Sequence, residues 1–141
     1  MLWANGDRKP LYLWYLNENR AADHRAHRRR DAVRLFEMVH SVDSLKLAQE
    51  LSGWAQKESK PLPVLLEVNV SGEASKFGCR PDQLLADLGR INALPRLEIH
   101  GLMTVGRLTS DPAEARRTFS DLRTTSDRCR ARWSDLGPAL S

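Results

Sequence analysis

The spacing of hydrophobic and polar positions changes several times along the chain, and each change marks a new structural element. An alternating run, Val64, Leu66, Val68 and Val70, stops abruptly at Ser71-Gly72 and predicts a buried strand over residues 64–70. Similar short runs predict strands over residues 38–41 and 97–103. Helical spacing fills the intervals, and this alternation is typical of parallel strands joined by right-handed crossovers.

The predicted helices have recognisable starts and buried faces. Asp43 is the expected N-cap of a helix whose apolar positions run from Leu47 to Ala55. Pro81 suits the first turn of the next helix and Asp111-Pro112 that of the last. The expected buried faces of these two helices are Leu84, Leu85, Leu88 and Ile91 in the first, and Ala115, Phe119, Leu122, Cys129 and Trp133 in the second.

Composition indicates a globular protein that remains in the cytoplasm. The chain has 141 residues, 41% hydrophobic and 28% charged, which is enough for one domain with a core. It contains no apolar run of membrane-spanning length and no signal-peptide pattern. Cys79 and Cys129 are isolated and lack metal-ligand spacing, so we expect two small apolar residues and no metal site, rather than a disulfide.

The net charge of +4 belongs to the N-terminal segment alone. Residues 1–30 hold seven Lys/Arg and three acids, whereas residues 31–141 hold fifteen of each. The basic run from His24 to Arg30 has two interpretations, contact with nucleic-acid phosphates or a solvated terminus, and we favour the second. We therefore divide the chain into a basic and aromatic segment, 1–30, and a domain, 31–141.

Polar side chains follow the predicted strands. Asn69 and Ser71 end the strand over 64–70, and Lys76 lies in the loop after it. His40 and Met103 lie near the ends of the other two strands. The carboxyl ends of parallel strands are where α/β proteins bind ligands, so these five residues are the candidate site.

Each candidate also has a purely structural interpretation. Asn69 and Ser71 are of the residue types that cap backbone groups, Lys76 could be a solvated loop lysine, and Met103 could belong to the core. Alternation alone leaves open which faces of their strands Glu67 and His100 occupy.

Three segments together resemble one known family. HSVDSLKLAQEL (40–51), LLEVNVSGEASKFG (65–78) and LPRLEIHGLMT (94–104) are similar, in order and spacing, to the pyridoxal phosphate homeostasis proteins, which share the N-terminal barrel of alanine racemase. The resemblance covers about residues 31–141. It implies a (β/α)8 TIM barrel, of which this chain would form about three β/α units, strands four to six.

The resemblance also implies a cofactor, pyridoxal 5′-phosphate, held at the mouth of the barrel. His40, Asn69, Ser71 and Met103 would line the pocket wall, and Lys76 is a further candidate. In the family the lysine that forms the Schiff base follows the first strand, and the phosphate is held after the seventh and eighth. Since residues 1–30 resemble no family strand, we expect a truncated or frame-shifted reading frame and weak or absent cofactor binding.

Three functions remain open from the sequence. The first is a non-enzymatic carrier or buffer of pyridoxal phosphate. The second is an alanine-racemase-like enzyme, and the third is a binding module that uses the basic N-terminus. In every case a slice of a barrel leaves sheet edges uncovered, so we also expect self-association.

Overall fold

The computed structural model describes residues 22–71, 78–106 and 110–134. Within them helices and strands alternate, and the strands form one parallel sheet in the order β1-β2-β3. The predicted α/β order with parallel strands is confirmed as an open three-stranded sheet. The strands are β1 (Val39–Val42), β2 (Leu62–Glu67) and β3 (Leu97–Met103); the helices are α2 (Ala22–Leu35), α3 (Leu45–Lys57), α4 (Pro81–Asn92) and α5 (Pro112–Ser134).

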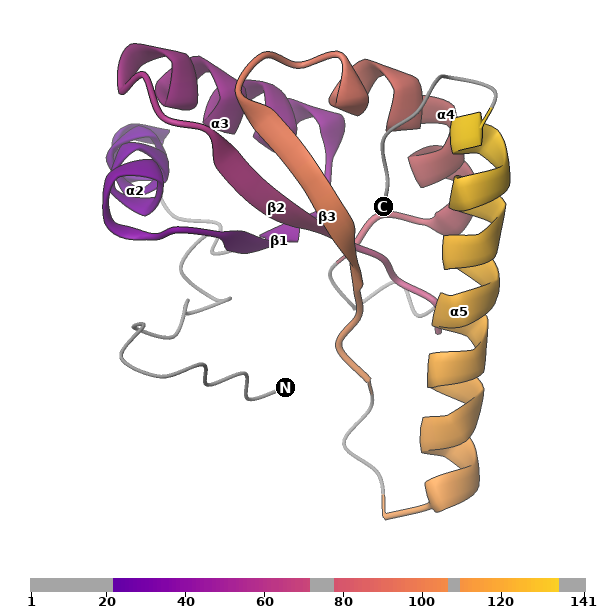
Figure 1. Ribbon diagram of the computed structural model, residues 1–141. Coiled ribbons are helices and arrows are strands. Elements are labelled where there is room, and N and C mark those ends of the chain that lie inside the picture. The colour runs from indigo at the N-terminus through magenta and orange to yellow at the C-terminus, as the bar shows by residue number, and fades with distance from the viewer. Residues whose placement is uncertain (1–21, 72–77, 107–109, 135–141) are drawn as a thin grey trace.

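The core lies between the sheet and its helices. In Figure 1, α3 and α4 lie above the sheet, α2 lies on the side of β1, and α5 runs alongside the β3 end. Val64 and Leu66 of the central strand are fully buried together with Leu51 of α3 and Leu88 of α4. Removing these apolar surfaces from water is the main force that holds the helices on the sheet.

The first strand and its following helix begin one residue or more from their predicted positions. β1 spans Val39–Val42 rather than residues 38–41. The prediction of Asp43 as the N-cap was wrong, because Ser44 has extended dihedral angles and its hydroxyl accepts a hydrogen bond from the Leu47 N–H at 3.1 Å. Both residue types are good caps, and the backbone conformation decides between them.

The central strand starts and stops earlier than its hydrophobic pattern indicates. It covers Leu62–Glu67, whereas the pattern gave 64–70. After Glu67 the chain bonds to a returning segment, because the Cys79 N–H donates to the Glu67 carbonyl at 2.8 Å and the Asn69 N–H donates to the Cys79 carbonyl at 2.9 Å. Val68 consequently forms only an isolated bridge, with Cys79.

The last two helices begin where the prolines predict. Pro81 and Pro112 are the first residues of α4 and α5, and Leu84, Leu88 and Ile91 are buried. The expectation that Phe119 is buried was wrong, since the residue is 66% exposed. The buried residues of α5 are Thr125, Cys129 and Trp133, all in its second half.

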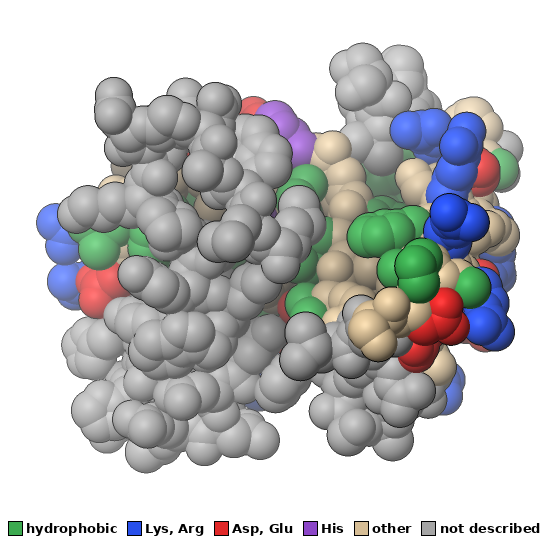
Figure 2. Space-filling view, turned by 90° about the horizontal axis from the view of Figure 1, so that it is seen from below, with side chains coloured by type: hydrophobic (Ala, Val, Ile, Leu, Met, Phe, Trp, Pro, Cys, Tyr) green, Lys and Arg blue, Asp and Glu red, His purple; other side chains and the backbone are tan. Residues whose placement is uncertain are grey.

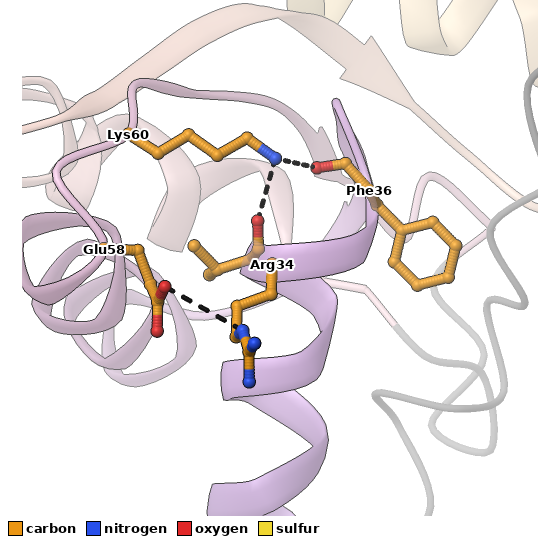
Figure 3. A network of polar contacts seen from close by, with 5 residues as sticks. Arg34, Phe36, Glu58 and Lys60 are labelled. Carbon is orange, nitrogen blue, oxygen red and sulfur yellow. Dashed lines mark hydrogen bonds and ion pairs between the residues drawn. The ribbon is translucent and has the colours of Figure 1, made fainter.

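A lysine closes the end of α2 (Figure 3). Lys60 Nζ donates to the carbonyl oxygens of Val33 at 2.9 Å and Phe36 at 2.8 Å. Nearby, Arg34 and Glu58 form an ion pair at 3.9 Å. The ammonium group satisfies carbonyls that a helix end leaves without partners, and it fastens α2 to the segment that leads into β2.

Candidate functional site

The carboxyl ends of the three strands lie at one edge of the sheet because the strands are parallel. Asp43 follows β1, Val68 and Asn69 follow β2, and Thr104 follows β3. This edge brings together residues from three separate parts of the sequence, as the candidate site requires.

The ends of β2 and β3 are joined by two short hydrogen bonds. The Val68 N–H donates to the Met103 carbonyl at 2.9 Å. In return, the buried Thr104 hydroxyl donates to the Val68 carbonyl at 2.7 Å. Both the N–H and the carbonyl of Val68 are therefore hydrogen-bonded to the end of β3. These bonds hold the backbone from which the polar residues after β2 extend.

Asn69 and Ser71 lie together at the end of β2. The Ser71 hydroxyl donates to Asn69 Oδ1 at 3.0 Å. Asn69 is half-buried and Ser71 is exposed, so the pair lies at the boundary with solvent. Its amide and hydroxyl groups are the kind that orient a polar ligand.

Met103 lies on the sheet face opposite the helices. The register pairs Val64 with Ile99 but Leu65 with Gly101, so His100 is an extra residue in β3. After this extra residue, Met103 pairs with Glu67 and Leu102 pairs with Leu66. Leu102 therefore faces the helices and packs against the core, whereas Met103 faces the other side of the sheet. Met103 is buried, and it lies outside the main core cluster.

β1 and the residue that follows it contribute three polar side chains. His40 lies within the strand rather than at its end, and burial lowers the pKa of its imidazole. Ser41 is fully buried, and its hydroxyl has no hydrogen-bond partner among the described residues. Burial raises the pKa of Asp43, although its own backbone N–H, the Ser44 hydroxyl and the Arg29 guanidinium partly oppose that shift.

The loop after β2 is anchored at its far end by Gly78 and Cys79. Gly78 has φ of +110°, and a Cβ there would lie 2.7 Å from the Asn69 nitrogen, so a side chain does not fit. Burial, and then the carboxylates of Asp87 and Asp43, raise the pKa of the Cys79 thiol to about 11. Lys76, the remaining candidate, lies outside the described residues.

Three residues of this edge escaped the sequence analysis as contributors to the site. Ser41 and Thr104 lie inside two of the segments that carry the family resemblance, and Cys79 directly follows the third. Their roles depend on burial or on contacts with other strands, which the sequence does not show.

Part of the basic run from His24 to Arg30 is turned toward the protein. Arg29 forms an ion pair with Glu50 of α3, and its side chain is only 17% exposed. Over the described ranges, no three His, Cys, Asp or Glu side chains gather closely enough to hold a metal ion. No helix in the same ranges is long and apolar enough to span a membrane.

Comparison with known proteins first identifies the class of domain to which the chain belongs. The family model described as "Alanine racemase, N-terminal domain" matches residues 19–136, which is most of the chain. An alanine racemase from Clostridium difficile has the same fold, with a TM-score of 0.62 at 15% identity, and the match covers 82% of this chain and 29% of the racemase. At that identity the likeness concerns the fold alone and carries no activity.

Proteins with higher sequence identity to this chain indicate a particular family within that class. A pyridoxal phosphate homeostasis protein from Pseudomonas aeruginosa is 47% identical over 88 residues, which cover 62% of this chain and 38% of the relative. PipY of Synechococcus elongatus, solved without pyridoxal phosphate, matches at 30% identity and a TM-score of 0.71, covering 75% of this chain and 49% of PipY. With the cofactor bound, PipY matches at 29% identity and a TM-score of 0.69, covering 76% of this chain and 49% of PipY.

Within the alanine racemase N-terminal domains, the chain belongs to the family of pyridoxal phosphate homeostasis proteins. The resemblance inferred from the three sequence segments is thus confirmed. The chain spans less than half the length of these relatives. The homeostasis relative is named for pyridoxal phosphate.

The described residues fit pyridoxal phosphate only in part. Asn69 and Ser71 offer hydrogen bonds, the Ser41 hydroxyl has no partner among the described residues, and the Met103 thioether suits an aromatic ring. The described residues that directly follow β1, β2 and β3 include no lysine, so they supply no amine for the cofactor's aldehyde. These groups suit non-covalent contacts with pyridoxal phosphate. They do not supply the amine that a covalent bond to the cofactor requires.

Proposed function

We propose that this chain forms part of the barrel of a cytoplasmic carrier or buffer of pyridoxal 5′-phosphate. In this proposal residues 31–141 correspond to the units around the fourth, fifth and sixth strands of the family barrel. The observation that carries the proposal is the match of three parallel strands and their helices to PipY, whose structure includes a form with the cofactor bound.

The proposed role of the strand ends is to line one wall of the cofactor pocket. Asn69 and Ser71 would offer hydrogen bonds from the end of β2, and Met103 would pack against the ring from β3. His40 is a more distant part of the same wall, since it lies inside β1. Bound pyridoxal phosphate supplies an aldehyde that reacts with primary amines, and Lys76 is the candidate amine nearest in sequence to this wall.

The proposal predicts that this polypeptide binds the cofactor weakly and without a covalent bond. A nitrogen–proton correlation spectrum recorded during a millimolar titration with pyridoxal phosphate tests it. We expect shifts confined to the amides around Asn69, Ser71 and Met103, and no such shifts with equimolar inorganic phosphate. If the chemical shifts of these amides do not change, the proposal that these residues line the cofactor pocket is wrong.

Absorbance separates weak from covalent binding. We expect no stoichiometric absorption band of a cofactor–lysine adduct after excess pyridoxal phosphate is removed. A stoichiometric band that disappears in Lys76→Ala, but persists in the matched control Lys46→Ala on α3, would contradict this expectation and identify Lys76 as the attachment point.

We also propose that the chain self-associates, because the described sheet has two edge strands. Specific nucleic-acid binding is not part of the proposal, since Arg29 is already paired with Glu50.

A further inference from the structure

Helices α4 and α5 lie beside one another and leave a groove between them. In Figure 1, α4 is next to the yellow, C-terminal half of α5. Leu85 and Ala86 border the groove from α4, and Arg128, Ala131 and Arg132 border it from α5. The groove is shallow and open to solvent, with a volume of about 510 Å³. Small molecules usually bind where most of their surface is enclosed, so an open groove suits a segment of another protein better.

The side of the groove that α4 forms is apolar. Leu85 is half-buried and Ala86 is exposed, as is Ala131 across the groove. The other apolar residues of α4, Leu84, Leu88 and Ile91, are buried in the core. α4 therefore has a second apolar strip, which the described part of the chain leaves in contact with water.

The side of the groove that α5 forms is basic. Arg128 and Arg132 lie four residues apart on one face of the helix, where like charges repel each other. Arg128 contacts the Asp82 carboxylate at 3.1 Å in an exposed pair, and Arg132 has no acidic partner among the described residues. α5 as a whole has six arginines and three acids. Figure 2 shows Lys and Arg side chains along the side of the molecule on which α5 runs, so this surface favours an anionic occupant.

We propose that the groove between α4 and α5 binds an acidic amphipathic helix of a partner protein. Two neighbouring helices offer a groove into which the side-chain ridges of a third helix fit. Apolar residues of the partner would cover Leu85, Ala86 and Ala131. Carboxylates spaced four residues apart on the partner would bond to Arg128 and Arg132 and relieve their repulsion.

The apolar strip favours a protein helix over nucleic acid as the occupant. Phosphates would also bind the two arginines, but they would leave Leu85 and Ala86 in contact with water. No residue that borders the groove comes from a strand or belongs to the candidate site. The proposal therefore does not depend on cofactor binding.

Two designed helical peptides test the groove with the full chain. The acidic peptide has leucines along one face and glutamates four residues apart beside them, and its control has glutamine in place of each glutamate. We expect the acidic peptide to shift the amide signals of Leu85, Ala86 and Ala131 and of their neighbours in the two helices. The glutamine peptide should bind about tenfold more weakly, because it lacks the charges that Arg128 and Arg132 recognise.

Three variants separate this groove from general attraction to a basic protein. Arg132→Glu should weaken binding of the acidic peptide about tenfold or more, because repulsion replaces attraction. Ala86→Trp should have a similar effect without a change of charge, since the indole would occupy the groove and the position is exposed. Arg123→Glu is the matched control: this exposed residue lies on the opposite face of α5 from Arg132, and its replacement should leave binding within about twofold.

Several outcomes would overturn the proposal. One is a set of groove amides that do not shift at millimolar acidic peptide. Another is an equal loss of binding in Arg132→Glu and Arg123→Glu, or no loss in Ala86→Trp, since the attraction would then be general. A single-stranded oligonucleotide that binds more tightly than the acidic peptide and shifts the same amides would assign the groove to nucleic acid instead.

Discussion

The Thr104 hydroxyl donates a 2.7 Å hydrogen bond to the carbonyl oxygen of Val68, thirty-six positions earlier in the chain. Thr104 is buried, so this bond forms away from water. It fixes the point at which β2 gives way to the loop that carries the candidate site. The relationship connects the stability of the sheet to the geometry of the candidate site at its edge.

Thr104→Val should lower the free energy of unfolding by about 1–3 kcal/mol, because it leaves a buried carbonyl without its donor. Thr104→Ser keeps the hydroxyl, so its free energy of unfolding should fall by less. Thr118→Val on α5 removes a 3.2 Å bond to the Glu114 carbonyl near solvent and serves as the control. Urea unfolding measures all three; equal losses for Thr104→Val and Thr118→Val would contradict the special role of Thr104.

Gly78→Ala should destabilise the protein by about 1–3 kcal/mol, since its positive φ and the 2.7 Å approach to Asn69 exclude a Cβ. Gly53 in α3 is the matched control, because a Cβ added there would meet no atom within 4 Å. Gly53→Ala should stabilise by about 0.5–1 kcal/mol through helix propensity. Thermal melts of the two variants should move in opposite directions, and movement in the same direction would argue against the steric explanation.

Lys60→Met should lower the free energy of unfolding by about 1–3 kcal/mol, because the carbonyls of Val33 and Phe36 lose a charged donor. Lys46→Met removes an exposed charge from the start of α3 and should have little effect. Hydrogen exchange would locate the loss, with faster exchange at the C-terminal end of α2. Unaltered exchange there would show that Lys60 does not hold this helix.

The Cys79 thiol should react slowly with iodoacetamide until the pH approaches 11, because burial and two nearby carboxylates raise its pKa to about 11. In the unfolded chain the thiol ionises near its ordinary pKa of 9.0. The unfolded state therefore releases its proton first, and the thiol's contribution to stability is lost as the pH rises from about 9 through 11.

Peptide mapping by mass spectrometry distinguishes Cys79 from Cys129 in this experiment, and the urea-unfolded chain is its control. The folded protein should show a reaction midpoint above that of the unfolded chain. A midpoint for Cys79 at or below the unfolded value would mean that the thiol is solvated or stabilised as a thiolate.

The sequence by itself determined the order of the elements, the parallel strands and the family. Pro81 and Pro112 start their helices where expected, because proline's fixed φ suits a first helical turn regardless of distant contacts. Residues 97–103 form β3 with the predicted bounds. Three segments in the family's order were enough to identify it, since each lies on an element whose local pattern is strong.

Only the tertiary structure decided what depends on partners far away in the chain. The hydrophobic run over 64–70 could not reveal that Cys79 takes the place of a sheet neighbour after Glu67. Alternation could not place Met103, because an extra residue at His100 changes which face the strand's end presents. Phe119 has the pattern of a buried residue, yet burial requires a neighbouring surface. Local periodicity records which face is apolar; contacts between separate segments decide whether anything covers it.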